Sequence, residues 1–192
     1  GMRMPRTLSM KIGNLDFSFE NSLVKIIANR NCPEIKLAGL DLGPFEEGNE
    51  YEVQYWIAKE LEKSGIARFR EEERFDSAKL YKIQWTERAQ TAGQISKLPE
   101  NFYPKLRRCL AELEQEAKTP EKMREYEKVK HLARDIVNSR LKKIVSLASA
   151  AAQTEQMLKN FAHEERFVYE RLYELIHEWR TQILEYEGEK ND

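Results

Sequence analysis

The sequence predicts an α+β protein in which a small N-terminal β-rich domain precedes a larger all-α helical domain. Between residues 15 and 75, short apolar segments are separated by Asn, Gly and Pro, as in strands joined by turns. From residue 98 onward, apolar residues recur every three to four positions, which is the period of an amphipathic helix. We therefore expect a β-rich domain over residues 2–75, a helical connector over residues 76–96 and an α-helical domain over residues 97–192.

The β-rich domain is expected to contain strands and one short helix. The strand-like segments are LDFSF (15–19), LVKIIA (23–28), EIKLAGLDL (34–42) and ARFRE (67–71). Pro44 and Gly48 are typical of a turn, and the residues that follow alternate as in a strand. The spacing in residues 53–65 predicts the short helix, which Gly65 is placed to end in the left-handed conformation.

The connector and the first helix of the C-terminal domain each begin after a residue suited to capping. Asp76 precedes a segment with four residues at helical spacing: Leu80, Ile83, Gln84 and Glu87. Asn101 precedes an apolar stripe that ends near Lys118. Pro104 is compatible with the first turn of that helix, because a backbone N–H there has no helical partner.

Two further helices are expected to complete the C-terminal domain. Thr119 and Pro120 predict an N-cap and the first residue of a helix that exceeds 25 residues. Its expected apolar stripe is Val129, Ala133, Ile136 or Val137, Leu141, Ile144 and Ala148. The last helix, ending near residue 186, has its expected buried side marked by Phe167, Leu172, Leu175, Ile176, Trp179 and Ile183.

The charge balance gives no general attraction to nucleic acid or anionic lipid. The 32 Lys and Arg residues nearly cancel the 33 Asp and Glu residues, so any nucleic-acid contact must be local. Cys32 and Cys109 are far apart in sequence and are expected to be free thiols in a reducing compartment. No apolar run approaches the roughly 20 residues of a membrane span. We expect a soluble, cytoplasmic protein.

Motifs for catalysis, cofactors and metals are missing from the sequence. The HEERF segment (163–167) has Phe167, and the HEWRT segment (177–181) has Thr181, where a zinc motif would have its second His. No glycine-rich loop ends in Gly-Lys-Ser/Thr, so nucleotide binding has no support. We expect no enzyme activity, no catalytic residues, no cofactor and no metal.

Arg140 lies at the margin of an apolar helical stripe, where a guanidinium must be paired. Two interpretations remain: a partly buried arginine held by a carboxylate or helix-end carbonyls, or a residue that recognises a ligand directly. A phosphate-binding patch is also conceivable, made of Lys130, Arg134, Lys142 and Lys143. The acidic residues between them weaken that interpretation, and Lys142 and Lys143 are equally compatible with solvated positions.

The C-terminal domain is rich in aromatic residues. They are Phe102, Tyr103, Phe161, Phe167, Tyr169, Tyr173 and Trp179. They could form the core of a single chain, but a thin layer of helices leaves two sides to cover, and aromatic residues are favoured at the centres of interfaces. We therefore expect some of them to face another subunit.

Four segments together resemble a subunit of the GINS complex of DNA replication, in the archaeal form whose small β-domain precedes the helical domain. They are GPFEEGNEYEVQYWIAKELEKSGIARF (43–69), SKLPENFYPKLRRCLAELE (96–114), VNSRLKKIVSLA (137–148) and EERFVYERLYELIHEW (164–179). The combination of Leu-Pro-x-x-Phe-Tyr with Arg-x-Lys-Lys-Ile carries most of the likeness. Residues before 43 contribute nothing to it.

The resemblance implies a non-catalytic scaffold. Archaeal GINS subunits commonly assemble as two copies of each of two types, so the implied partner is a companion subunit with the helical domain first. The assembly bridges the MCM helicase to a RecJ/Cdc45-like protein, with primase or polymerase as further partners. Direct DNA binding is expected to be weak or absent. The alternative is a nucleic-acid-binding module in which residues 53–71 act like a winged helix.

From the stripes and the resemblance we select a set of positions as core or subunit interface. They are Leu98, Phe102, Tyr103, Arg140, Ile144, Tyr169 and Trp179.

Overall fold

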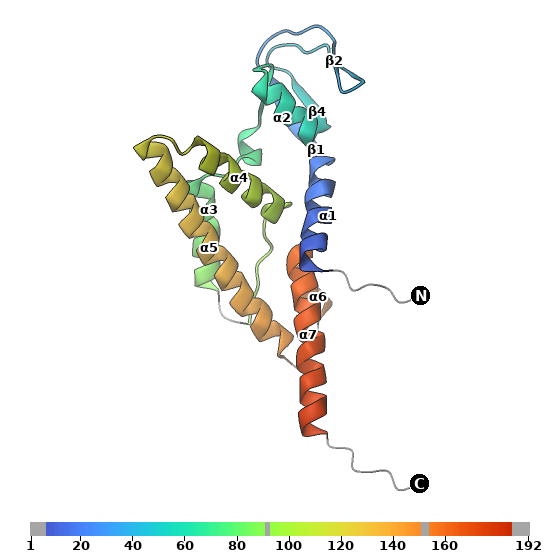
Figure 1. Ribbon diagram of the computed structural model, residues 1–192, viewed down its shortest axis with the longest axis vertical. Coiled ribbons are helices and arrows are strands. Elements are labelled where there is room, and N and C mark those ends of the chain that lie inside the picture. Colours follow the sequence, from blue (N-terminus) through green and yellow to red (C-terminus); the bar gives the residue numbers. More distant parts are fainter. Residues whose placement is uncertain (1–6, 91–92, 151–153, 186–192) are drawn as a thin grey trace. The chain divides into compact units, whose positions relative to one another are not determined.

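The computed structural model describes residues 7–90, 93–150 and 154–185 (Figure 1). It divides into two compact units, which are described separately. The β-rich unit is residues 13–75, and the helical unit is residues 76–192 together with the start of the chain up to residue 12. The predicted α+β class is confirmed, because strands are confined to the first unit and long helices dominate the second.

The β-rich unit is built on an antiparallel three-stranded sheet in the order β4-β1-β5. The central strand is β1 (Leu23–Ala28), which pairs with β4 (Glu50–Gln54) on one side and with β5 (Ala67–Phe69) on the other. Alternate residues of β1 are buried, as expected for a sheet with one face on a core. A short 3₁₀ turn, η1 (Glu71–Glu73), follows β5.

The segment 34–42 forms a hairpin of two short strands. β2 (Ile35–Leu37) pairs with β3 (Leu40–Leu42) in a separate two-stranded sheet. Ala38 and Gly39 both have positive φ, at 51° and 80°, as a two-residue hairpin loop with a type I′ turn requires.

Helix α2 (Tyr55–Lys63) completes the core of the β-rich unit. It contributes Ile57, Ala58 and Leu61 to an apolar cluster with β1 and β5. The other members of that cluster are Val24, Ile26, Ala28, Phe45, Ile66 and Ala67. The predicted end of this helix is confirmed, since Gly65 has a φ of 73° directly after the C-cap.

The segment 15–19 is a helix, so the strand predicted there is wrong. It belongs to α1 (Leu8–Glu20), whose first turn is capped by the Thr7 hydroxyl accepting from the Met10 N–H. The more buried residues of α1 lie three to four positions apart, from Ile12 through Leu15 to Phe19. Five alternating residues are too few to distinguish that helical period from a strand period.

Three helices pack on a central one in the helical unit. The central helix is α5 (Pro120–Ala148), which contacts α3 (Ser77–Ala89), α4 (Phe102–Glu116) and α7 (His163–Leu184). Figure 1 shows α3 lying along α5, and α4 approaching α5 near the start of that helix. A single turn, α6 (Glu155–Leu158), precedes α7.

The predicted starts of these helices are confirmed. Asp76 accepts from the Lys79 N–H at 2.8 Å, and Thr119 accepts from the Lys122 N–H at 3.3 Å. Pro120 is the first residue of α5, which is 29 residues long. Helix α4 begins directly after Asn101 as predicted, but Asn101 has a φ of 56° and its side chain makes no capping hydrogen bond. The predicted end of the last helix near residue 186 lies outside the described residues.

The expected buried stripes are only partly correct. On α7, Leu175, Trp179 and Ile183 are 63%, 62% and 59% exposed. Figure 1 shows that α7 continues past the end of α5, its partner helix. On α5, Val137 and Leu141 are also exposed. These apolar side chains are not needed to close the core of the chain's described residues.

Candidate functional site

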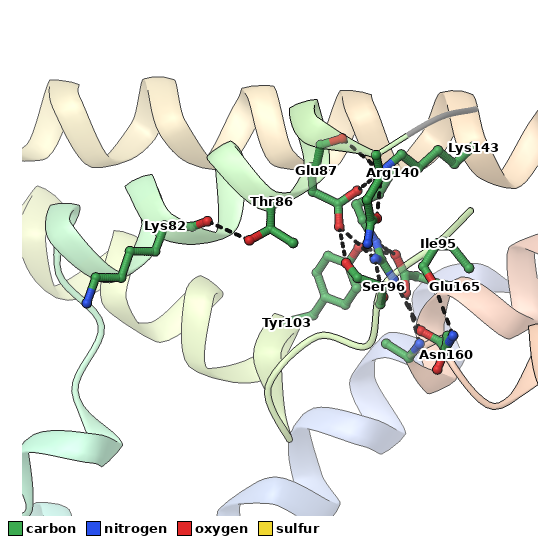
Figure 2. A network of polar contacts seen from close by, with 12 residues as sticks. Lys82, Thr86, Glu87, Ile95, Ser96, Tyr103, Arg140, Lys143, Asn160 and Glu165 are labelled. Carbon is green, nitrogen blue, oxygen red and sulfur yellow. Dashed lines mark hydrogen bonds and ion pairs between the residues drawn. The ribbon is translucent and has the colours of Figure 1, made fainter. Parts of the chain in front are cut away.

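Arg140 lies at the centre of a buried ion network in the helical unit (Figure 2). Its Nε and Nη2 atoms donate to the two carboxylate oxygens of Glu165, at 2.7 and 2.6 Å, in the two-pronged geometry that suits a guanidinium. Its Nη1 donates to Glu87 Oε1 at 2.9 Å and to the Ser96 carbonyl at 2.6 Å, and Nη2 also donates to the Asn160 carbonyl at 3.3 Å. The guanidinium is therefore fully engaged within the chain.

A second cation shares the network. Lys143 is buried, and its Nζ donates to Glu87 Oε2 at 2.6 Å, to the Glu87 carbonyl at 3.0 Å and to Gln90 Oε1 at 3.3 Å. Ser96 Oγ donates to Glu87 Oε1 at 2.9 Å. Two cations thus face two carboxylates, so the buried cluster carries no formal excess charge.

The network joins α3, α4, α5 and α7 with the segments that precede α4 and α7. Glu87 lies in the last turn of α3, and Ser96 lies in the segment before α4. Arg140 and Lys143 both lie on α5. Glu165, in the first turn of α7, also accepts from the Tyr103 hydroxyl of α4 at 2.8 Å. The Leu-Pro-Glu-Asn-Phe-Tyr segment therefore fixes the start of α4 to α5 and α7.

The electrostatics of the network favour the charged forms of Glu87 and Arg140. Burial alone would raise the pKa of Glu87, but hydrogen bonds from Lys143 and Arg140 outweigh it and hold that pKa below its ordinary value. Burial alone would lower the pKa of Arg140, whereas Glu165 and Glu87 raise it overall. Burial and the Glu165 carboxylate both raise the pKa of Tyr103, which keeps its hydroxyl proton as a donor.

The selected positions fall into three groups in the structure. Leu98, Phe102, Arg140, Ile144 and Tyr169 are buried in the helical unit. Tyr103 is partly buried at the network, and Trp179 is exposed on α7. Of the two interpretations of Arg140, the structure shows the guanidinium paired with carboxylates.

Sequence reasoning missed most partners of Arg140. Glu165 and Ser96 are not among the predicted positions. Lys143 is buried, so the prediction that it is solvated or part of a phosphate-binding patch is wrong. Glu87 carried a signal, since a carboxylate at helical spacing from Leu80 lies on the side of α3 that faces the core. The remaining members of the patch, Lys130, Arg134 and Lys142, are exposed.

An apolar groove of about 270 Å³ lies beside the network. Its wall residues from α5 are Val137, Leu141 and Ile144, and α7 adds Val168. The remaining lining residues are Leu8, Ile12, Tyr103, Arg107, Arg140, Glu164 and Glu165. Val137 and Leu141 continue on the surface of α5 as an exposed stripe with Val145, each 40 to 45% exposed. This groove and stripe form a continuous apolar surface of the kind that protein interfaces cover.

The part of the chain that the structure describes offers neither a metal-binding cluster nor a membrane-spanning helix. Within residues 7–90, 93–150 and 154–185, no group of His, Cys, Asp and Glu side chains is arranged to hold a metal ion. No helix in these ranges has the length and apolar character needed to cross a membrane. Cys109 is partly buried, and burial together with Glu112 raises the pKa of its thiol to about 11.

Comparison with known proteins gives matches to both units. A family model described as the GINS complex protein helical bundle domain matches residues 74–184, and a PSF2 N-terminal domain model matches residues 11–69. The human DNA replication complex GINS protein PSF2 is 29% identical over 151 residues, or 78% of each chain. The Xenopus laevis protein of the same name is 30% identical over 101 residues, or 53% of this chain and 54% of that protein. Since the helical-bundle match spans more than half of its length, the chain belongs to the GINS helical bundle family.

Proposed function

We propose that this chain is the PSF2-like subunit of a GINS complex and acts as a non-catalytic scaffold in DNA replication. The observation that carries the proposal is the apolar surface formed by the groove and the α5 stripe, beside a network that fixes the helices around it. Burial of such a surface against a companion subunit would supply the affinity, and the charged network beneath would supply a fixed shape.

The proposed complex follows the archaeal arrangement. Its companion is a GINS subunit with the helical domain first, and two copies of each type form the tetramer. The tetramer bridges and activates the MCM helicase at the fork, through contacts with the helicase and a RecJ/Cdc45-like protein, with primase or polymerase as further partners. This places the chain at the nucleoid.

The alternative of a winged-helix reader has weaker support. The cations of α2 are engaged with carboxylates of the same helix, Lys59 with Glu62 at 3.4 Å and Lys63 with Glu60 at 3.6 Å. A helix that must contact phosphates needs cations in excess of carboxylates.

The test is assembly of the chain with a companion subunit. The two proteins are co-expressed, and the mass of the purified complex is measured by light scattering. We expect a stable heteromeric complex for the natural chain and for Met123→Glu, whereas Leu141→Glu should weaken assembly at least about tenfold. Met123→Glu is the matched control for Leu141→Glu, because both residues lie on α5 and have similar exposed fractions, 44% for Met123 and 45% for Leu141. A chain that stays monomeric beside its companion, or equal behaviour of the two variants, would contradict the proposal.

A further inference from the structure

Helix α3 exposes two large aromatic side chains to solvent. Its core side consists of Leu80, Gln84 and Glu87, which are buried. Tyr81 and Trp85 are 59% and 65% exposed and lie one helical turn apart, so that their rings share one strip of the surface. Two large rings in solvent are not explained by the closure of the core.

Contacts on the core side hold this face in a fixed position. Asp76 caps the start of α3, and Gln84 Nε2 donates to Asp135 Oδ2 at 2.6 Å. Glu87 is held by Arg140 and Lys143 in the buried network. A ligand that covers Tyr81 and Trp85 would therefore meet a preorganised surface and would not have to order the helix first.

The exposed charged side chains that α3 itself contributes are cations. The exposed charged side chains of α3 are Lys82 and Arg88, and the one carboxylate of the helix, Glu87, is buried and already paired. Figure 2 shows Lys82 extending away from the network, whereas Glu87 points into it. Arg88 is 68% exposed even though it contacts Asp135 at 3.1 Å. An occupant with carboxylates beside its apolar groups would match this surface.

We propose that the α3 aromatic face, defined as Tyr81, Lys82, Trp85 and Arg88, docks a segment of a partner protein in which large apolar side chains are flanked by Asp or Glu. The rings supply the apolar anchors, and the cations select an acidic partner. A single strand of nucleic acid would also stack on the rings, but it needs a row of cations that follows its backbone. The α3 aromatic face has two cations, Lys82 and Arg88, and Arg88 already contacts Asp135.

This face is separate from the surface assigned to the companion subunit. None of the described residues that line the groove comes from α3. Docking on α3 thus goes beyond the proposed assembly and can be tested in the assembled complex or in the full chain by itself.

The test begins with selection from a displayed library of random peptides on the immobilised full chain. Peptides are kept when they bind the natural chain but not the Tyr81→Ser/Trp85→Ser variant. We expect the selected peptides to be enriched in Asp and Glu next to Leu, Phe or Trp. In fluorescence anisotropy, the double variant should weaken their binding at least about tenfold and Lys82→Glu should weaken it severalfold.

The matched control is Phe17→Ser, which removes a 72% exposed ring from α1 and should leave binding unchanged. Circular dichroism and thermal unfolding report whether each variant keeps its fold, which is expected because the replaced rings are exposed. The proposal is overturned if no selected peptide depends on Tyr81 and Trp85, or if the selected peptides are basic or neutral. It is also overturned if labelled oligothymidine binds through these rings and the acidic peptides do not.

Discussion

The core of the β-rich unit is apolar throughout, from Val24 in β1 to Ala67 in β5, whereas the core of the helical unit encloses a guanidinium, an ammonium and two carboxylates. Apolar contacts are non-directional and tolerate small shifts of their elements. A buried ion network is satisfied only when its donors and acceptors meet in one arrangement. The helical unit thus has buried ionic contacts where the β-rich unit has apolar ones, and these contacts require one defined placement of α3, α4, α5 and α7.

The largest expected effect comes from removing the centre of the network. Arg140→Ala would leave the carboxylates of Glu87 and Glu165 buried with fewer partners, which should lower the free energy of unfolding by about 3 to 5 kcal/mol. Urea unfolding followed by circular dichroism measures the change. Arg134→Ala is the control on the same helix, because Arg134 is exposed and its loss should cost less than about 0.5 kcal/mol. Similar losses for the two variants would contradict a structural role for the network.

Truncation of a buried apolar side chain in the β-rich unit should lower the free energy of unfolding somewhat less than Arg140→Ala does. Leu61 is 1% exposed in α2, and Leu61→Ala should lower the free energy of unfolding by about 3 kcal/mol through lost burial and a cavity. Leu40→Ala, at a residue 44% exposed, is the control and should have a small effect. Equal effects of Leu61→Ala and Leu40→Ala on urea unfolding would show that the apolar core is not as described.

A smaller effect is expected at the edge of the network. Tyr103→Phe removes only the hydroxyl that donates to Glu165 at 2.8 Å, and should cost about 2 kcal/mol because the acceptor is charged and buried. Tyr126→Phe is the control, since it leaves intact the ring that Lys130 contacts. Thermal and urea unfolding of both variants give the comparison. A neutral Tyr103→Phe would mean that Glu165 is satisfied without this donor.

The smallest expected effect is a change with pH in the free energy of unfolding, which should depend on the core of the helical unit and not on that of the β-rich unit. The pKa of Glu87 is lowered in the folded chain, so its contribution to stability is present above its ordinary value of 4.5 and is lost as the pH falls below that value. The difference in unfolding free energy between the natural chain and Glu87→Gln should therefore shrink between about pH 5 and about pH 3, by at most about 1.4 kcal/mol per pH unit. The difference between the natural chain and Leu61→Ala should stay constant. A constant Glu87→Gln difference would contradict the linkage.

Local features of the fold were predictable from the sequence. Helix starts at Asp76 and Thr119-Pro120 depend on neighbouring residues, and so does the end of α2 at Gly65. The helix at residues 15–19 was missed because a short alternating run is compatible with both periods. The network was not predictable, because Glu87 and Glu165 lie 53 and 25 residues from Arg140 and meet it only through tertiary packing. An apolar stripe such as that of Trp179 also does not reveal whether it faces its own chain or a partner.

Amide hydrogen exchange of the full chain, comparing the natural sequence with Arg140→Leu, tests most directly that the ion network holds the helical unit in one arrangement. Leucine keeps an apolar side chain at this position of α5 but leaves Glu87 and Glu165 without their shared cation. We predict a loss of protection in the last turn of α3 and the first turns of α4 and α7, with unchanged protection in β1. Unchanged exchange in all these helices, or an equal loss in β1, would contradict the account.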